Sequence, residues 1–327
     1  MSAPLILVHG GAGAMRSMQG DAAAAYRAGL VEAARRGREV LARGGDALEA
    51  VVAATRHMEA SGAFNAGQGS CLDEAGDYAL DAALMRGSDR AAGAVGAMTA
   101  TWSAAELCLD LLREGRHVLL VAAGADARAR ALGLPALPPP PPEKLAQHQE
   151  LLAAAAARAA PLRLEEMGTV GRPDDETEGG PDLGHDTVGA VAIDAQGGLA
   201  AAVSTGGLWL KSPGRVGDSA VIGAGLFACD ELGAAAVATG IGERMIRDLT
   251  CHRACQLAEE EGAAAGAAAA IDALARRFGP DSGGVIVIDR HGHAGAAFNT
   301  QGMGRALARV GEEEIPVAVW PEDPFPV

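Results

Sequence analysis

The chain has 327 residues, of which 49% are hydrophobic but only 3% are aromatic. This length allows one large domain or two ordinary ones, and small apolar residues have to fill the core, which suits closely packed sheets and helices. The formal net charge of −15 repels nucleic acid and anionic membranes, so we expect neither as a partner.

The start of the chain and its cysteines indicate the compartment. The first residues carry no basic segment and their apolar run stops at His9, unlike a signal peptide, and no apolar run suits a membrane span. Five cysteines, an odd number, suggest no disulfide framework. We therefore expect a cytoplasmic protein. Cys251 and Cys255 flank His252, but without a second pair of ligands they are better explained as reduced thiols on a helix than as a metal site.

Strands and helices alternate in the first half of the chain. An apolar strand at 4–8 is expected to run into a glycine turn at 9–13. Apolar residues recur at helical spacing in 45–60. The other expected elements are helices at 21–43 and 103–114 and strands at 77–85, 92–99 and 117–122.

A change of composition marks the middle of the chain. Residues 135–142 include five consecutive prolines, an alanine-rich helical stretch follows at about 143–160, and residues 171–184 are polar and rich in helix breakers. Such a segment buries too little apolar surface to stay ordered, so we expect a disordered linker at about 135–183. A linker that ends at a strong strand pattern is the layout of a precursor processed into two chains.

The second half begins with that strand. Two hairpins are expected, one from 187–193 and 199–205 and one from 284–289 and 294–299. Between them, 240–260 and 264–278 read as helices. Together with the first half, this order predicts sheets covered by helices on both sides.

The first hairpin places two threonines together. If it is symmetric about Gln196, Ile193 faces Leu199 and Thr187 faces Thr205. Directly opposed residues point to the same face of a sheet, with Cβ atoms about 4.5–5.5 Å apart. The two hydroxyls would then lie side by side at the open end of the hairpin, unless the register slips by one residue.

Thr187 can become a nucleophile if the chain is cut before it. Within a chain, a threonine has no adjacent base, but an amino-terminal threonine carries an α-amine with an ordinary pKa of about 7.7–8.0 that can take the hydroxyl proton. The Thr187 hydroxyl could itself attack the Asp186 carbonyl and form an ester that water opens. A threonine that starts a strand usually has only a structural role, so the residues around Thr187 must decide whether it is a nucleophile.

Two later segments could complete such a site. Arg215 and Asp218, three residues apart in a glycine-rich loop, could bind the carboxylate and the ammonium of an amino acid, or they could form a surface ion pair. Residues 239–243 (TGIGE) are expected to begin a helix. The free backbone N–H groups of such a helix start could bind an oxyanion, or the segment could have no role beyond starting the helix.

Several ordered motifs then point to one family. The second half contains HDTVG at 185–189, STGG at 204–207, GRVGDS at 214–219, GAG at 223–225 and TGIGE at 239–243; the first half contains HGGAG at 9–13 and FNAG at 64–67. These motifs resemble those of the plant-type L-asparaginases, also called isoaspartyl (β-aspartyl) peptidases, a family of N-terminal nucleophile (Ntn) hydrolases. The resemblance covers nearly the whole chain except the linker.

The resemblance implies an α+β fold, the four-layer αββα sandwich of Ntn hydrolases. It also implies self-cleavage between Asp186 and Thr187 into an α subunit (1–186) and a β subunit (187–327) that form one structural domain, and a dimer of such αβ heterodimers. The implied activity is hydrolysis of β-aspartyl dipeptides and L-asparagine, releasing L-aspartate, with no cofactor for catalysis.

The resemblance also assigns roles to residues. By similarity, Thr187 is the nucleophile, Thr205 supports it, and Asn65, Gly10 and Gly11 position it. Thr239 and the Gly240 N–H form the oxyanion hole, and Gly240 also borders the substrate. Arg215 binds the substrate α-carboxylate, and Asp218 and the Gly242 carbonyl bind its α-amine. The family's structural sodium would be bound by the backbone carbonyls of Met58, Glu59, Ser61, Phe64, Ala66 and Gln68.

The chain departs from the family pattern at a few positions. Gly304 stands where the family usually has tyrosine and Ala220 where it has proline, and one extra residue lies near 231–233. No catalytic group is lost. The glycine is expected to widen or loosen the wall of the site, which affects the choice of leaving group.

Three alternatives remain open. The enzyme could prefer β-Asp-Arg or β-Asp-Lys, the dipeptides of cyanophycin. It could be an uncleaved, inactive relative, against which the intact threonines, Arg215 and Asp218 argue. Residues 9–13 could form a dinucleotide-binding turn, but the full G-x-G-x-x-G pattern and a following acidic residue are missing.

Overall fold

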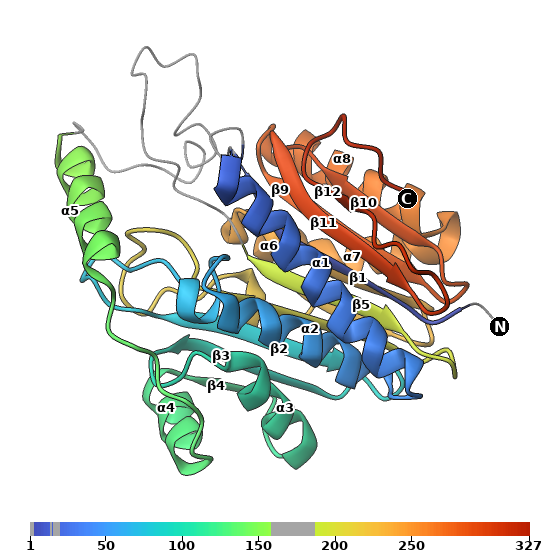
Figure 1. Cartoon of the computed structure of the whole chain (residues 1–327), viewed down its shortest axis with the longest axis horizontal. Helices are drawn as coiled ribbons and strands as arrows, with labels where there is room; N and C mark the ends of the chain where they lie inside the picture. Colours follow the sequence, from blue (N-terminus) through green and yellow to red (C-terminus); the bar gives the residue numbers. More distant parts are fainter. Residues whose placement is uncertain (1–2, 14, 16–19, 158–186) are drawn as a thin grey trace.

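Two β-sheets organise the chain, in a computed structural model that describes residues 3–13, 15, 20–157 and 187–327 (Figure 1). The larger sheet has the strand order β12-β11-β1-β5-β6-β2-β3-β4, and the smaller has β10-β9-β8-β7. All neighbouring strands are antiparallel except β3 and β4. The strands are β1 (Leu5–Gly13), β2 (Leu80–Arg86), β3 (Ala92–Met98), β4 (Leu119–Val121), β5 (Val188–Ile193), β6 (Leu199–Thr205), β7 (Leu226–Cys229), β8 (Ala234–Gly240), β9 (Gly283–Asp289), β10 (Ala294–Phe298), β11 (Gly302–Arg309) and β12 (Val317–Ala318).

The hairpin β5–β6 forms the middle of the larger sheet. Its register runs from Ile193↔Leu199 to Val188↔Ser204, which confirms the symmetric pairing expected from the sequence. β1 lies on the other side of β5, so the strand that follows Thr187 is held by neighbours on both sides. The predicted second hairpin, β9–β10, is also confirmed.

Helices α1 (Gly20–Ala42), α2 (Ala47–Ser61) and α3 (Ala104–Glu114) pack on one face of the larger sheet (Figure 1). Their core side chains, such as Leu30 and Val51, meet Val188 and Ala202 from the sheet. The Asp46 carboxylate accepts a hydrogen bond from the Glu49 N–H and caps the start of α2. These three helices agree with the predicted ones.

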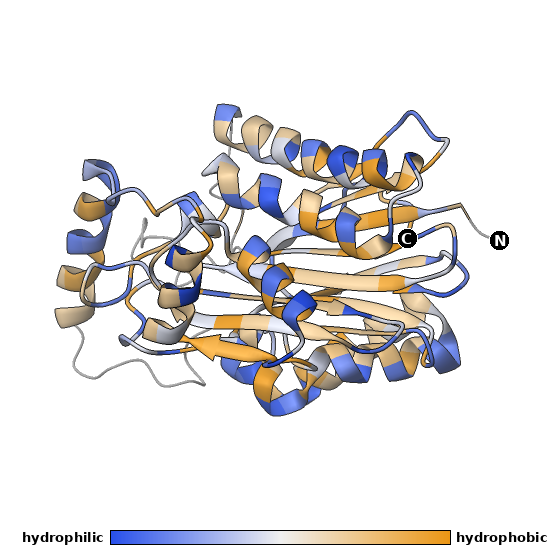
Figure 2. Ribbon diagram, turned by 90° about the horizontal axis from the view of Figure 1, so that it is seen from below, coloured by the Kyte–Doolittle hydropathy of each residue, from blue (hydrophilic) through white to orange (hydrophobic). Residues whose placement is uncertain are grey.

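Helices α7 (Thr250–Glu261) and α8 (Ala263–Phe278) cover one face of the smaller sheet. Cys251 and Cys255 point into that core with Ala236 and Val287, which accounts for their spacing as packing on one helix face. Burial raises the pKa of both thiols. The sheets share a second apolar core, to which the larger contributes Val191 and the smaller Val237. Figure 2 shows apolar strands beside helices with hydrophilic outer turns.

Several expectations were wrong. Residues 9–13 continue β1 through an irregularity between His9 and Gly11 instead of forming a turn. The helix expected at 240–260 is two helices, α6 (Gly242–Asp248) and α7, because Leu249 between them has the left-handed φ of 53°. Helix α4 (Ala122–Ala131) and strands β7, β8, β11 and β12 were not expected. The sequences of α4, β8 and β11 are rich in alanine or glycine, and β7 and β12 are only 4 and 2 residues long, so none carries a clear periodic signal.

The segment expected as a disordered linker begins with an ordered helix, α5 (Pro142–Ala156). This corrects the linker range, although the helical stretch itself was expected. The His148 ring lies 2.9 Å from the Asp73 carbonyl, and Lys144 donates a 2.6 Å bond to the Ser70 carbonyl, so two polar contacts anchor α5. The later part of the linker and Asp186 lie outside the described residues. Within the described ranges, no helix is both long and apolar enough to cross a membrane.

Candidate active site

Two threonine hydroxyls meet at the open end of β5–β6. The Thr187 hydroxyl donates to the Thr205 hydroxyl across 3.1 Å, and the Thr205 oxygen also accepts from the Gly207 N–H at 2.9 Å. Both side chains are nearly buried, with 6% and 3% of their surfaces exposed. Thr205 therefore fixes the position of the Thr187 oxygen, as the register predicted.

The loop after Thr205 is fixed by Asn65. Its side-chain amide donates to the Gly207 carbonyl at 2.7 Å, and its own backbone carbonyl accepts from the Gly206 N–H at 2.9 Å. The amide oxygen accepts from the Cys71 N–H at 2.9 Å. Asn65 thus holds the loop whose Gly207 N–H bonds Thr205, and its positioning role stays a prediction.

Two buried charged residues that the sequence analysis gave no role also hold this region. Lys211 donates to the carbonyls of Ala79 and Gly206, the latter at 2.6 Å, and burial lowers its pKa. The Asp81 carboxylate accepts from the N–H groups of Ala97 and Gly217, both at 2.8 Å. In the sequence, the only indication of a role for Lys211 is that it begins the segment that contains Arg215. Asp81 lies in a strand whose sequence gives no indication of a role in the site.

Arg215 is paired with Glu243 through two bonds. Its Nε and Nη2 atoms each lie 2.9 Å from a Glu243 carboxylate oxygen, so the pair joins the glycine-rich loop to α6. Burial disfavours the guanidinium charge, but the bonds to Glu243 and the charges of Glu243, Asp81 and Asp218 outweigh it, so the pKa of Arg215 is raised. The surface ion pair between Arg215 and Asp218 that the sequence left open is therefore wrong, since the partner is Glu243.

Asp218 is buried beside the same arginine. Its Oδ2 atom has no hydrogen-bond partner among the described residues, and burial, opposed by the Arg215 charge, raises the pKa of Asp218 to about 7. A Cβ on Gly242 would lie 2.7 Å from Asp218 Oδ1 and 2.9 Å from Arg215 Nη2. Glycine at this position therefore lets the α6 backbone approach both groups, and an unpaired buried carboxylate suits a cationic ligand.

Thr239 and Gly240 end strand β8 and do not open a helix, because α6 begins only at Gly242. Gly240 has φ 135° and packs against the Ser282 carbonyl, a conformation and contact that favour glycine. Val237, two residues before Thr239 on the same face of β8, approaches Gly189 of β5. Since side chains alternate along a strand, Thr239 faces the larger sheet.

The sequence also matches a known protein family. The family profile described as Asparaginase matches residues 2–316. The chain belongs to the asparaginase family.

Its relatives in this family match over almost their whole length. The chain is 40% identical to the plant-type L-asparaginase of Pyrobaculum calidifontis, over 94% of this chain and 97% of that protein. It is 36% identical to the isoaspartyl peptidase of Salmonella typhimurium (95% and 97%) and 34% identical to the isoaspartyl peptidase/L-asparaginase of Xenopus laevis (97% and 95%). The resemblance read from the motifs is confirmed.

The two glycines expected to position the nucleophile of this asparaginase lie in β1, the neighbour of β5. A Cβ on Gly10 would lie 2.7 Å from the Tyr26 hydroxyl and 2.8 Å from the Phe64 ring. Gly11 has φ 123° after the irregularity in the strand. Close packing and an unusual backbone angle explain why two glycines stand here.

Gly304, where the resemblance leads us to expect tyrosine, faces away from Thr187. A Cβ on Gly304 would run into the Tyr26 ring of α1, and the neighbouring Ala306 belongs to the core beneath the same helices. Thr187 shares the opposite face of the sheet with Val191, which lies in the core between the sheets. The expected widening of the site wall is therefore wrong, because Tyr26 fills the space.

The loop expected to hold sodium folds tightly after α2. Gly62 ends the helix in the left-handed conformation, and the Glu59 and Phe64 carbonyls pack against Gly67 and Gly69. Each of these glycines leaves room for a carbonyl oxygen where a Cβ would otherwise lie. Carbonyl oxygens are ligands that hard cations prefer, but the Met58 carbonyl accepts from the Ser61 hydroxyl and the Phe64 carbonyl from the Ala66 N–H, so the sodium site stays a prediction.

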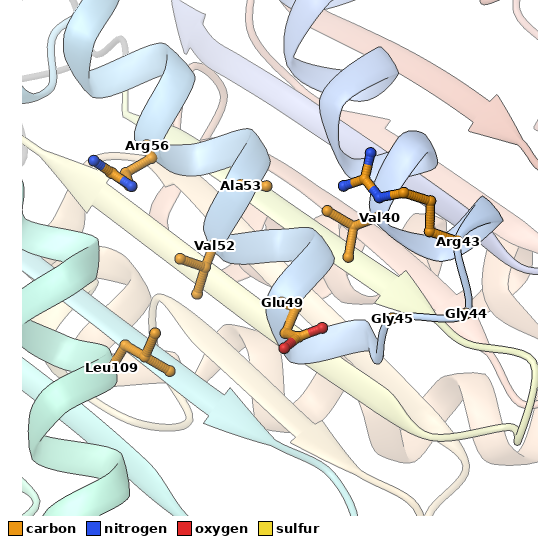
Figure 3. A pocket seen from close by; sticks show the side chains of 9 residues that line it. All are labelled: Val40, Arg43, Gly44, Gly45, Glu49, Val52, Ala53, Arg56 and Leu109. Atoms are coloured by element: carbon orange, nitrogen blue, oxygen red, sulfur yellow. The ribbon is translucent and has the colours of Figure 1, made fainter.

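A surface pocket of about 530 Å³ lies elsewhere (Figure 3). Its lining includes Val40, Arg43, Glu49, Arg56 and Leu109, carried by α1, α2, α3 and the turn between the first two. None of the predicted site residues lines it. These helices lie on the face of the larger sheet opposite Thr187, so we assign the pocket no part in the chemistry.

Proposed function

We propose that the protein is a hydrolase that uses Thr187 to cleave β-aspartyl amide bonds in isoaspartyl dipeptides and in L-asparagine, releasing L-aspartate. The observation that carries this proposal is the 3.1 Å contact between the Thr187 and Thr205 hydroxyls, with Thr239 facing the same sheet. Membership of the asparaginase family, with relatives named for both activities, supports it.

Self-cleavage creates the active enzyme. The Thr187 oxygen attacks the carbonyl carbon of Asp186, the bond from that carbon to the Thr187 nitrogen breaks, and the nitrogen takes a proton. Water then hydrolyses the resulting ester to leave the Asp186 carboxylate and a free Thr187 amine. The products are an α subunit of residues 1–186 and a β subunit of residues 187–327, packed as one structural domain.

The free amine then acts as the base for substrate hydrolysis. It takes the Thr187 hydroxyl proton while the oxygen attacks the substrate β-carbonyl, and the proton passes to the departing ammonia or amino acid. Thr239 and the Gly240 N–H stabilise the negative oxygen of the tetrahedral intermediate. Water attacks the acyl-enzyme and releases L-aspartate, restoring Thr187. Thr205, held by Gly207, keeps the nucleophilic oxygen in place.

Both ends of the aspartyl group have a complementary residue. The Arg215 Nη1 atom makes no hydrogen bond to the described residues, since Glu243 occupies Nε and Nη2, and it faces the substrate α-carboxylate. Asp218 and the Gly242 carbonyl bind the α-ammonium. Because only the leaving group differs between L-asparagine and an isoaspartyl dipeptide, one site serves both.

The larger architecture of the family is part of the same proposal. The two sheets and their helices form the four-layer αββα sandwich of Ntn hydrolases, and two αβ units pair as a dimer of heterodimers. No cofactor takes part in catalysis. A structural Na⁺ held by the carbonyls of Met58, Glu59, Ser61, Phe64, Ala66 and Gln68 would fix the loop that carries Asn65. Cytoplasmic location stays a prediction.

The proposal is tested by intact-mass measurement of the denatured protein over time. Two fragments divided at Thr187 support it, and Thr187→Ala should remain one chain while Thr187→Ser is cut, because serine keeps the hydroxyl. A wild-type chain that stays whole for days would identify an inactive relative. Turnover of β-Asp-Leu, β-Asp-Arg, β-Asp-Lys and L-Asn then separates general dipeptidase, cyanophycin-dipeptide and asparaginase preferences.

A further inference from the structure

His9 is a buried polar side chain that the proposed mechanism does not use. It lies in β1 with no exposed surface and pairs with Gly189 of β5, two residues from Thr187. Neither of its ring nitrogens makes a hydrogen bond of ordinary geometry to a described residue. An unpaired buried imidazole costs free energy, so its position calls for a physical reason.

The ring points toward the side of the sheet that carries the nucleophile. Leu5 and Leu7, which alternate with the residues facing the helices, lie in the core between the two sheets, and His9 continues that series. A Cβ on Gly189 would collide with His9 Nε2. The imidazole therefore lies over Gly189, and only a glycine there leaves room for it.

Thr187 stands where the backbone ladders end. The pairing of β5 with β1 stops at Gly189, and its pairing with β6 stops at Val188. Thr187 is therefore past the last paired residue on both sides. The Thr205 hydroxyl holds its side chain, but strand pairing does not hold its backbone. The His9 ring is next to this unpaired end.

The electrostatics of His9 agree with a contact to that backbone. Burial lowers the pKa of His9 to about 3. The Thr187 backbone acts in the opposite direction and raises this pKa, which is the effect of a hydrogen-bond acceptor on an imidazole. At neutral pH the ring is uncharged, with one N–H donor and one acceptor nitrogen. A neutral ring of such weak basicity suits a structural hydrogen bond better than proton abstraction.

The geometry points to His9 as a positioning residue for the nucleophile: its neutral imidazole donates a hydrogen bond to the Thr187 backbone carbonyl and extends the β1–β5 ladder by one side-chain bond. This inference rests on the proposed function. Self-cleavage turns the Thr187 nitrogen from an amide into a free amine, but it leaves the Thr187 carbonyl group unchanged. The carbonyl is therefore the part of the Thr187 backbone that can stay fixed before and after cleavage. His9 holds that side during cleavage and during each turnover.

Two substitutions separate positioning from space filling. His9→Phe keeps a ring but removes the donor; we expect both self-cleavage and kcat to fall about tenfold or more, as the loss of one positioning bond implies, with KM within about threefold. His9→Gln keeps an N–H donor at a similar reach and should recover most of both rates. KM stays nearly unchanged because Arg215 and Asp218, which bind the aspartyl group, do not contact His9.

The control is Val8→Ala. Val8 is adjacent to His9 in β1, but its side chain lies on the opposite face, in the core beneath the helices. Its truncation should therefore lower Tm without changing kcat or KM of the folded enzyme. Wild-type rates in folded His9→Phe, or a His9→Gln variant as slow as His9→Phe, would overturn the inference. So would a change confined to KM.

A measurement without substrate separates this inference from the proposed function. In protein labelled with ¹⁵N-histidine and with threonine carrying ¹³C at its carbonyl carbon, the His9 ring should appear as a neutral tautomer. Its N–H proton should exchange slowly, and its nitrogen should couple across the hydrogen bond to the Thr187 carbonyl carbon. Absence of that coupling, or a charged ring at pH 6, would overturn the role of His9 even in an active enzyme. A wild type that neither cuts itself nor hydrolyses substrate refutes the proposed function, whatever the coupling shows.

Discussion

The Thr187 and Thr205 hydroxyls lie 3.1 Å apart although 18 positions separate them in sequence. The hairpin register produces this contact. Residues pair from Ile193 with Leu199 to Val188 with Ser204, and continuing the same register brings Thr187 opposite Thr205. A single hydroxyl partner that is itself held by the Gly207 N–H gives the nucleophile a fixed position before substrate binds.

Thr205→Val should disable the nucleophile without removing it. Valine keeps the shape but leaves the Thr187 hydroxyl and the Gly207 N–H without their partner, so we expect kcat to fall about 10²-fold with a small change in KM. Steady-state kinetics on L-asparagine and β-Asp-Leu measure this. Thr205→Ser, which keeps the oxygen, should retain most activity; equal losses in both variants would argue against a role for the hydroxyl.

Asp218 should make substrate binding depend on pH. Its raised pKa of about 7 means that below this pH the free enzyme loses the negative charge that holds the α-ammonium. The dissociation constant of L-aspartate, measured by calorimetry, should therefore rise by about tenfold per pH unit below pH 7 and level off above it. Asp218→Asn should bind weakly with little pH dependence; an unchanged slope in that variant would assign the titration to another group.

The same carboxyl should reduce stability at neutral pH. The folded protein keeps a proton on Asp218 that the unfolded chain, with the ordinary pKa of 3.8, releases. The free energy of unfolding therefore falls as pH rises from about 4 to about 7. We expect Asp218→Asn to have the higher Tm at pH 8 and the difference to shrink toward pH 4. A lower Tm for the variant at pH 8 would contradict this assignment.

Arg215→Lys should weaken substrate binding although the charge remains. Lysine cannot bind Glu243 through two bonds and present a fork to the substrate as well. We expect KM to rise about tenfold to a hundredfold, corresponding to one lost charged hydrogen bond. Glu243→Gln, which keeps one acceptor oxygen, should give a smaller rise. If Glu243→Gln raises KM more than Arg215→Lys, Glu243 contacts the substrate itself.

Gly304→Ala should affect stability and leave specificity alone. The added methyl meets the Tyr26 ring, and overpacking of this kind costs about 1–3 kcal/mol. Thermal unfolding should show a lower Tm, and the loss should be smaller when Tyr26→Ala is the background, because the ring is gone. The ratio of β-Asp-Arg to β-Asp-Leu turnover should not change; a shifted ratio would return Gly304 to the wall of the site.

Much of the site could be read from the sequence because its motifs are local. Turn formers between two strand-like arms fix the β5–β6 register, and with it the approach of Thr187 to Thr205. Likewise, periodic apolar residues were enough to locate α1, α2 and α3. In contrast, the sequence predicts the start of a helix at Thr239, where the structure has the end of strand β8, because alanine-rich β8 has no alternating pattern.

The sequence by itself determined the family and predicted the nucleophile and the ligands of the aspartyl group, since each lies in a short segment whose residue types carry the chemistry. The tertiary structure decided what those segments face. Packing across two sheets placed Glu243 on Arg215, Tyr26 over Gly304 and His9 beside Thr187. Such partners are far apart in the chain, and their burial changes their charges and free space, which no local pattern records.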